Sequence, residues 1–254
     1  MAAAVVAIAL AVVAGCGDVD DGASARDGKG GGTLTVFAAA SLTETFTSLG
    51  RTFEGSHPGV KVRFNFGGSS TLAQQITQGA PADVFAAASP TTMKTVTDAG
   101  DAAASPQVFT KNRLVIAVPK DNPGRVATVG DLSGPGLKVV LCAVQVPCGA
   151  AAQMALAAAK VEVEAASREQ DVKAVLTKVG LGEADAGLVY RTDVRAAGGK
   201  VTGIEFPEAA QAINDYPVVE VAKAPQGALA KEFIRLVLGP QGTAVLTRAG
   251  FEAP

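Results

Sequence analysis

Two stretches of the chain place hydroxyl-bearing residues where a predicted strand gives way to a predicted helix. The first is FAAASLTETF, residues 37–46, in which Ser41 is followed three residues later by Glu44. The spacing Ser-x-x-Glu is typical of a capping box, so we expect Ser41 to begin a helix. The second, GGSSTLAQQI at residues 67–76, repeats the order of strand, small residues, hydroxyls and helix. Ordinary helix capping explains such junctions, and a binding site built from several helix starts is the alternative.

A helix start can bind an anion without any charged side chain. Its first backbone N–H groups have no partner within the helix, and the helix dipole adds roughly half a positive charge there. Besides Ser41 and Ser69-Ser70, the junctions Cys148-Gly149 and Asp171-Val172 have this form, and Tyr190 adds a hydroxyl at a strand end. If these starts converge in space, neutral donors alone would hold an anion.

The elements that must position these residues alternate along the chain from Thr33. Strand patterns are expected at residues 33–39, 60–66, 82–88, 113–119, 137–143, 186–190, 201–207 and 216–222. Helical patterns are expected at residues 41–53, 71–78, 90–99, 149–160, 171–179, 228–238 and 241–248. This alternation predicts an α/β fold with mainly parallel sheets, and it supplies more strands than one compact sheet of this size holds.

We therefore expect two lobes, each a mainly parallel sheet flanked by helices, with a ligand in the cleft between them. Lobe I comprises residues 33–110 plus about 195–254, and lobe II about 111–194. In open α/β sheets ligands bind beyond the carboxyl ends of the strands, which is where the hydroxyl-bearing junctions lie.

The composition argues against several classes of function. The 254 residues carry 22 basic and 24 acidic side chains, well mixed, and the chain has two Tyr and no Trp, so nucleic acid is not an expected partner. The single histidine, His57, lies in a polar turn without catalytic partners, and Asp83 is interpreted as a structural residue. With no Ser–His–Asp set, metal cluster or phosphate-cradling glycine loop, we expect no enzyme and no cofactor.

The first sixteen residues, MAAAVVAIALAVVAGC, are typical of a secretory signal peptide. The apolar run is too short to span a bilayer. Its end, Val-Ala-Gly-Cys, resembles a bacterial lipobox and predicts a lipid anchor at Cys16, although Lys and Arg are missing from the start of the signal; a plain cleavable signal is the alternative. Residues 17–32, rich in Gly and Asp, are expected to form a flexible tether. Together these features predict a protein outside the cytoplasm, held at the cell membrane of a bacterium.

Cys142 and Cys148 are close in sequence, and in that compartment two such residues are expected to form a disulfide, with free thiols as the alternative. The loop that they would close is small, so the entropic stabilisation amounts to roughly 2 kcal/mol. Stiffening of the segment CAVQVPC is the more important expected effect.

The order of several motifs resembles a known family. TVFAAASLTETF, GGSSTLAQQITQGAPADVFAAAS, VQVPCGAAAQMAL, AGLVYRTDV and YPVVEV are similar in sequence and spacing to the periplasmic molybdate-binding proteins, the substrate-binding subunits of molybdate ABC transporters. The resemblance covers nearly all of residues 33–254. It implies a class II periplasmic-binding-protein fold and a monomer that captures molybdate, and tungstate as well, for delivery to a permease. Molybdenum would be present only within the bound oxyanion.

The resemblance also implies a set of ligand-binding residues. Ser41 and Ser69 would each give a hydroxyl and a backbone N–H, Cys148 and Val172 backbone N–H groups, and Tyr190 its hydroxyl. Ser69, rather than its neighbour Ser70, follows from counting back from the motif STLA. Another tetrahedral oxyanion, such as sulfate, is the alternative ligand. Phosphate is disfavoured because it carries a proton at neutral pH and needs an acceptor, and none of the five residues is acidic.

Overall fold

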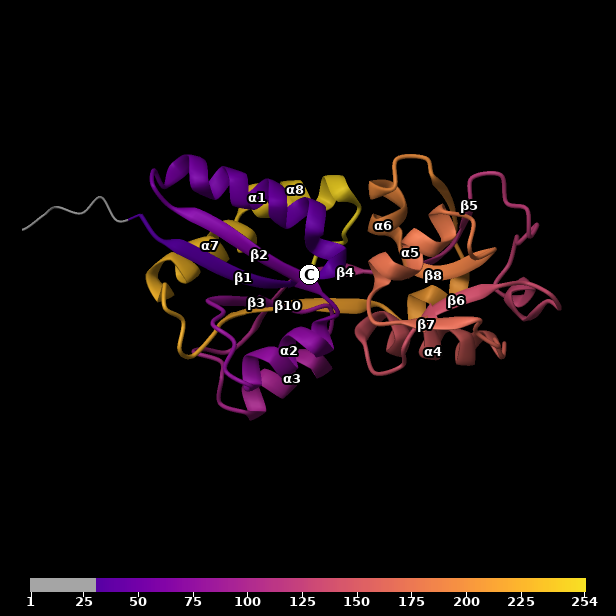
Figure 1. Cartoon of the computed structure of the whole chain (residues 1–254), viewed down its shortest axis with the longest axis horizontal. Helices are drawn as coiled ribbons and strands as arrows, with labels where there is room; N and C mark the ends of the chain where they lie inside the picture. Colours follow the sequence, from indigo (N-terminus) through magenta and orange to yellow (C-terminus); the bar gives the residue numbers. More distant parts are fainter. Residues whose placement is uncertain (1–30) are drawn as a thin grey trace, which may run out of the picture.

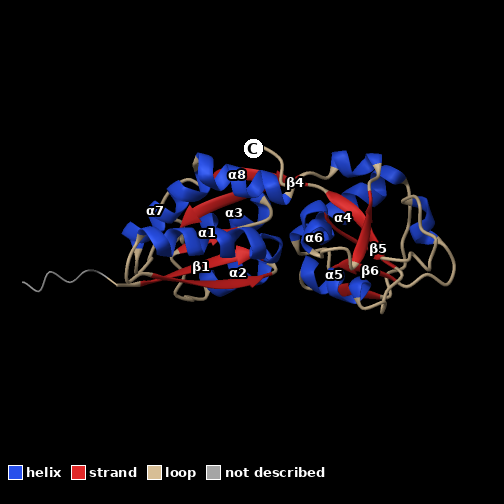
Figure 2. Cartoon of the chain, turned by 90° about the horizontal axis from the view of Figure 1, so that it is seen from above, coloured by secondary structure: helices blue, strands red, loops and turns tan. Residues whose placement is uncertain are grey.

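The computed structural model describes residues 31–254, which form two lobes lying side by side (Figure 1). The expected signal peptide, Cys16 and all but the last two residues of the expected tether lie outside the described residues. Each lobe is built on one five-stranded sheet with helices on both faces, as Figure 2 shows from a second direction. Within residues 31–254, no helix combines the length and the apolar character needed to cross a membrane.

The first sheet has the strand order β2-β1-β3-β10-β4. Its strands are β1 (Thr33–Ala39), β2 (Lys61–Gly67), β3 (Val84–Ala86), β4 (Gln107–Asn112) and β10 (Asn214–Glu220). Strands β1, β2 and β3 pair in parallel, whereas β10 runs antiparallel to both of its neighbours. The central strand β1 is apolar throughout its second half because both faces are covered: Val36 packs into the core on one face and Phe37 into the core on the other.

Five helices cover this first sheet. Helices α1 (Thr43–Ser56), α7 (Gly227–Leu238) and α8 (Pro240–Ala249) pack on one face, and α2 (Ser69–Thr77) and α3 (Pro90–Asp98) on the other (Figure 1). The first group buries Phe46, Phe53 and Phe233 in a single cluster. Helix α3 begins as predicted, because the hydroxyl oxygen of Ser89 accepts a hydrogen bond from the N–H of Thr92 at 3.2 Å.

The second sheet has the strand order β7-β6-β8-β5-β9. Its strands are β5 (Leu114–Pro119), β6 (Val139–Cys142), β7 (Ser167–Glu169), β8 (Ala186–Tyr190) and β9 (Val201–Ile204). Here β6, β7 and β8 pair in parallel, and β5 runs antiparallel to β8 and β9. In both sheets the reversed strand is the one that the chain enters from the other lobe. The expected two-lobed, class II α/β fold is confirmed.

Helices α4 (Pro147–Ala159), α5 (Val172–Gly180) and α6 (Arg191–Ala196) flank the second sheet, together with the short 3-10 helices η2 (Gly130–Ser133) and η3 (Pro207–Gln211). Their apolar side chains join those of the strands in one core cluster. Helix α5 begins one residue after Asp171, whose carboxylate accepts a hydrogen bond from the N–H of Ala174 at 3.0 Å. This helix start was expected from the sequence.

The chain returns to the first lobe later than expected. It leaves that lobe at Arg113, between β4 and β5, close to the expected boundary at 110–111. The expected return at about residue 195 is wrong, because β9 pairs with β5 and the side chains of Phe206 and Ala209 lie in the second core. The return occurs between η3 and β10, at Ala212 and Ile213.

All strands of the two sheets except the reversed strands β10 and β5 point their carboxyl ends toward the junction of the lobes. Every junction that carries an expected site residue follows the end of β1, β2, β6, β7 or β8. The topology therefore brings together residues that lie up to 149 positions apart in the sequence, Ser41 and Tyr190.

Candidate functional site

A small cavity lies between the two lobes, and all five residues expected from the sequence line it. Its walls include Ser41 and Ser69 from the first lobe, and Cys148, Val172 and Tyr190 from the second. The space accessible to water-sized atoms is about 20 Å³. A single water needs roughly 10–15 Å³ on this measure, so the cavity suits a compact polyatomic ion and excludes a sugar or an amino acid.

Three helices present their N-terminal ends to this cavity. Ser69 is the first residue of α2, Cys148 the second residue of α4, and Val172 the first residue of α5. Their backbone N–H groups precede the point at which intrahelical bonds begin, and no other acceptor within residues 31–254 bonds to them. The helix dipoles add positive potential at the same place, so the cavity has the character of an anion site.

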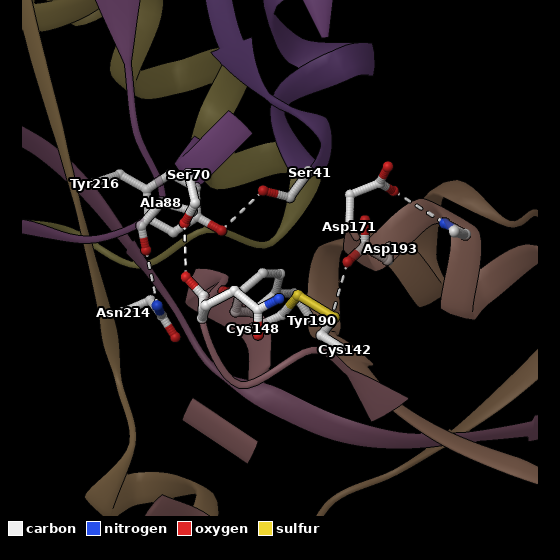
Figure 3. Close-up of a disulfide and its surroundings, with 12 residues drawn as sticks. Ser41, Ser70, Ala88, Cys142, Cys148, Asp171, Tyr190, Asp193, Asn214 and Tyr216 are labelled. Carbon is white, nitrogen blue, oxygen red and sulfur yellow. Dashed lines mark hydrogen bonds between the residues drawn. A yellow bond between two sulfur atoms is a disulfide. The ribbon is translucent and has the colours of Figure 1, made fainter. Parts of the chain in front are cut away.

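Ser41 does not cap a helix, which corrects the prediction from the Ser-x-x-Glu spacing. It lies inside a 3-10 turn, η1 (Ala40–Leu42), and α1 starts only at Thr43, with no side-chain capping bond. The Ser41 hydroxyl instead forms a hydrogen bond of 2.8 Å with the hydroxyl of Tyr216 (Figure 3). The Glu44 carboxylate reaches Lys173 of the other lobe rather than the start of its own helix. The Ser41 side chain is thus available to the cavity.

Tyr190 carries a buried hydroxyl without a hydrogen-bond partner among the described residues. The residue is 1% exposed and lines the cavity. Burial raises the pKa of the phenol well above its usual value of 10, and the nearby Tyr216 and Asp193 raise it further. The hydroxyl therefore stays protonated at any physiological pH. A buried unpaired donor is costly, and an acceptor placed in the cavity would satisfy it.

The two serines at the start of α2 have different roles in the structure. The Ser69 hydroxyl oxygen accepts a hydrogen bond of 3.0 Å from the N–H of Ala88, which leaves its own hydrogen free to donate. Ser70 does not line the cavity. Its hydroxyl donates to the carbonyl of Gln145 in the opposite lobe at 2.7 Å.

Cys142 and Cys148 are joined by a disulfide, with their Cα atoms 5.8 Å apart (Figure 3). The bond ties the end of β6 to the first turn of α4, across the loop 143–147. The turn is tight, since a Cβ atom at Gly149 would lie only 1.9 Å from the carbonyl oxygen of Ala143. Glycine at this position lets the α4 start approach the cavity.

Charge is almost absent from the cavity wall. Among its lining residues in the described chain, only Asp171 carries a carboxylate, and no Lys or Arg side chain contributes. In residues 31–254, no group of three or more His, Cys, Asp and Glu side chains could hold a metal ion. An anion would be held here by hydrogen bonds and helix ends rather than by a counter-charge.

The residues interpreted as structural do have structural partners. His57 closes the end of α1, where its ring stacks on Phe53 and its Nε2 atom lies 2.7 Å from Glu232. The bond of Nδ1 to the Phe53 carbonyl and that of Nε2 to Glu232 raise the pKa of His57. The Asp83 carboxylate accepts hydrogen bonds from the N–H groups of Thr35 and Gln226, each at 2.7 Å.

Sequence reasoning missed two features beside the cavity, Tyr216 and the pair formed by Lys173 and Asp193. Tyr216 is buried and contacts Ser41 from 175 positions away. Asp193 is fully buried, accepts a hydrogen bond from the N–H of Tyr190 at 3.1 Å, and faces the ammonium of Lys173 at 3.2 Å. The aspartate in YRTDV was the available signal, because an acidic residue three positions after a strand end often bonds back to that end.

Comparison with known proteins places the chain among binding proteins. A family model described as bacterial extracellular solute-binding protein matches residues 34–252. The molybdate-binding protein ModA of Mycobacterium tuberculosis (strain ATCC 25618 / H37Rv) is 41% identical over 249 residues, which cover 98% of this chain and 95% of that protein.

Two solved structures share the fold. The periplasmic molybdate-binding protein of Azotobacter vinelandii has a TM-score of 0.76 and 24% identity, covering 87% of this chain and 99% of that one. The sulfate-binding protein SubI of Mycobacterium tuberculosis H37Rv has a TM-score of 0.73 and 17% identity, covering 87% and 86%. At these identities the likeness concerns the fold, which serves more than one oxyanion.

Proposed function

Because this chain belongs to the bacterial extracellular solute-binding proteins, which bind solutes and are not enzymes, we propose that it captures molybdate outside the cytoplasm and delivers it to an ABC transporter permease. The proposal is supported by 41% identity to a protein named for molybdate binding, across 98% of the chain. Tungstate has the same shape and charge and is expected to bind as well.

The observation that carries the proposal is the Tyr190 hydroxyl, which has no partner among residues 31–254 and lies in an almost uncharged cavity at three helix N-termini. A donor that is buried and cannot ionise needs an acceptor, and the unpaired N–H groups of the helix starts need acceptors too. A tetrahedral dianion has acceptors on four sides and no hydrogen to donate. It would satisfy donors that converge from both lobes.

In this proposal the five cavity residues bind the anion from both lobes. Ser41 and Ser69 bind from the first lobe through their hydroxyls and N–H groups. Cys148 and Val172 donate backbone N–H groups, and Tyr190 its hydroxyl, from the second lobe. The Tyr216 hydroxyl supports Ser41 from behind, because it can accept a hydrogen bond from Ser41 or donate one to it.

Sulfate is the second candidate, since a sulfate-binding protein shares the fold. Sulfate is smaller than molybdate, so donors set to surround molybdate would reach it less well. Phosphate needs an acceptor for its proton. Asp171 lines the cavity and could offer one, but one of its carboxylate oxygens is already engaged by the N–H of Ala174. A fully deprotonated dianion is therefore the favoured ligand.

The transport role also needs a site of attachment and a partner. A lipid on Cys16 and the tether at 17–32 would keep the two-lobed body close to the membrane, within reach of the permease. The protein would act as a monomer, because the cavity is completed by the two lobes of one chain.

Isothermal titration calorimetry on the purified protein tests the proposal, with molybdate, tungstate, sulfate and phosphate as separate titrants. We expect molybdate and tungstate to bind one to one and sulfate and phosphate far more weakly. Tighter binding of sulfate than of molybdate would identify the second candidate as the function. Lack of binding by all four anions would refute an oxyanion site.

A further inference from the structure

One ammonium group joins the three segments that carry Ser41, Val172 and Tyr190. The Nζ atom of Lys173 lies 2.9 and 3.0 Å from the two carboxylate oxygens of Glu44 in the opposite lobe. The same Nζ atom lies 3.2 Å from Oδ1 of Asp193 in its own lobe. Lys173 belongs to α5, Glu44 to α1 and Asp193 to α6, so the contact spans both lobes.

Each of these three charged residues is tied closely to a cavity residue. Lys173 directly follows Val172, and Glu44 lies three positions after Ser41, in the first turn of α1. Asp193 accepts the hydrogen bond from the N–H of Tyr190 (Figure 3). A movement of the ammonium relative to either carboxylate would therefore move the donors that line the cavity.

The two contacts of Lys173 differ in how easily they can separate. Asp193 is 0% exposed, and Lys173 is the cation that faces it, so breaking this pair would leave a buried charge unpaired. Burial raises the pKa of Asp193 to about 6 even though Lys173 opposes that rise. The Glu44 side chain is 52% exposed and can be solvated alone. When the lobes part, the lysine is expected to stay with Asp193 and to leave Glu44.

We propose that Lys173 is a positioning residue that latches the two lobes over the bound anion by pairing with Glu44. This inference rests on the proposed oxyanion-binding function and adds to it the residue that sets how long the anion is retained. The Glu44 carboxylate separates from the Lys173 ammonium when the lobes open, while Asp193 holds the ammonium in place. The contact from Ser70 to the Gln145 carbonyl is uncharged and would not respond to salt. The ion pair of Arg191 with Glu252 also joins the lobes, but it is kept in variants of Glu44, so a difference in salt response between these proteins reports the pair of Lys173 with Glu44.

Stopped-flow measurement of molybdate dissociation from the full mature protein tests the latch. Glu44→Gln should raise the dissociation rate about three- to tenfold with little change in the association rate, and Glu44→Lys should raise the dissociation rate further. Removing a negative charge near an anion would by itself slow release, so faster release reports the lost contact. Added salt should accelerate release from the wild-type protein more than from Glu44→Gln.

Asp98→Asn is the matched control, because Asp98 forms an exposed ion pair of 2.6 Å with Lys94 within α3 and does not line the cavity. Its dissociation rate should equal that of the wild type. An unchanged or slower dissociation rate for Glu44→Gln would overturn the latch, even if molybdate binding itself is established.

If the wild-type protein binds no oxyanion, the proposed function fails, and small-angle scattering of the unliganded proteins still tests the latch. Glu44→Gln should then show a larger mean radius of gyration than the wild type and Asp98→Asn. Equal radii for all three proteins would overturn the inference. Equal melting temperatures would show that the change lies in lobe movement rather than in folding, because the ion pair that Glu44 makes within the described residues crosses the junction.

Discussion

Tyr190, Ser41 and Tyr216 place three hydroxyls within one buried region at the junction of the lobes. The rings of the two tyrosines meet edge to face with centroids 6.1 Å apart, and the Ser41 hydroxyl bonds to that of Tyr216. Burial raises the pKa of both phenols, so neither adds negative charge near the cavity. Neutral donors fixed in this way suit a multiply charged anion, because none of them needs to lose or gain a proton on binding.

Removal of one hydroxyl should weaken molybdate binding without unfolding the protein. Tyr190→Phe and Ser41→Ala each delete one donor and keep the backbone in place. A hydrogen bond to a charged group contributes roughly 1.5–3 kcal/mol, so each variant should lose about ten- to a hundredfold in affinity. Calorimetry gives the affinity. Thermal unfolding of unliganded Tyr190→Phe should show little change, whereas Ser41→Ala should be somewhat less stable because it removes the partner of the buried Tyr216 hydroxyl.

Cys148→Ala tests the backbone donors. Its expected contribution is an N–H group, which alanine retains, but the substitution also breaks the disulfide with Cys142, so Cys142→Ala, which loses the same bond, is the matched control. The two cysteine variants should bind alike, with a smaller loss of affinity than the hydroxyl variants. Normal binding by Tyr190→Phe and Ser41→Ala, together with binding by Cys142→Ala but not by Cys148→Ala, would contradict the assignment of the site.

Asp193 gives the protein a pH dependence of stability that can be isolated by substitution. Burial raises its pKa from 3.8 to about 6, outweighing the ammonium of Lys173, which lowers it. The groups that face it are Lys173 from α5, Glu44 from α1, and the phenols of Tyr190 and Tyr216. Since the folded state holds the proton more strongly than the unfolded chain, this group stabilises the fold below about pH 4 and loses that contribution as pH rises through 6.

Asp193→Asn should therefore become more stable relative to the wild type as pH rises from 4 to 7. The pKa difference corresponds to a change of up to roughly 3 kcal/mol in the free energy of unfolding, and contributions from His57, Glu169 and Glu252 cancel because both proteins contain them. Chemical denaturation at several pH values provides the measurement. A stability difference that does not vary with pH would show that Asp193 has an ordinary pKa.

At the level of helices and strands, Gly149 lets α4 start beside the cavity. An alanine Cβ at this position would lie 1.9 Å from the Ala143 carbonyl oxygen and 2.9 Å from that of Cys142. Gly149→Ala should push the helix start away from the loop 143–147, lowering the melting temperature and weakening molybdate binding together. Gly180→Ala, near the end of α5, is the control, because its Cβ would meet only Val201 at 3.7 Å. Equal stability of the two variants would contradict the tight turn.

Periodicity and turn residues were sufficient to predict the elements with strong local signals. The strands at 33–39 and 186–190 were predicted with the bounds that β1 and β8 have, and the last helix, predicted at 241–248, is α8 at Pro240–Ala249. Strands β4 and β7 and helix α6 were missed. Strand β7 and helix α6 are short, and strand β4 is partly polar and leads into β5 without a turn signal. The predicted lobe boundary near residue 195 was wrong for a related reason: the local sequence pattern does not show that β9 pairs with β5.

The candidate site was predicted more fully than its surroundings. Helix starts after strands are local features, so the junctions that reach the cavity could be marked from the pattern. The choice of Ser69, Cys148 and Val172 within those junctions came from the resemblance to the molybdate-binding proteins. The role of Ser41 was misjudged, because its partner Tyr216 lies 175 positions away and the local Ser-x-x-Glu spacing favoured a cap. The contact between Glu44 and Lys173, 129 positions apart, depends on how the lobes meet, so it cannot be predicted from either segment alone.

At the scale of the whole molecule, the cavity is complete only when the two lobes are in contact, because residues of both lobes line it. The chain crosses between them twice, at Arg113 and at Ala212–Ile213. Near the first crossing the carboxylate of Glu252, at the end of the chain, bonds to the guanidinium of Arg113 and lies 3.4 Å from that of Arg191. These contacts lie next to the crossing, so they can persist while the distant edges of the lobes separate. We therefore expect an anion to enter by rotation of the lobes about the two crossings.

A substitution at Gly68 tests whether the two lobes must close over the anion. It lies in the first lobe, just before α2, with φ of −61° and ψ of 125°, a conformation that alanine adopts without strain. A Cβ atom there would lie 2.2 Å from the carbonyl oxygen of Gln170 in the second lobe. Gly68→Ala should therefore fold normally but prevent full contact between the lobes. We expect its affinity for molybdate to fall at least about tenfold, since donors of the second lobe can no longer reach the anion.

Small-angle scattering with and without molybdate, combined with calorimetry, measures this effect. The wild-type protein should become more compact on binding, and Gly68→Ala should not, while its unliganded melting temperature stays the same. Gly55→Ala is the control, because no atom lies within 4 Å of the added Cβ and the residue is inside α1 of the same lobe. It should close and bind like the wild type. Wild-type affinity and compaction in Gly68→Ala would mean that the anion is bound without close contact between Gly68 and Gln170, and the lobes would then have to meet elsewhere.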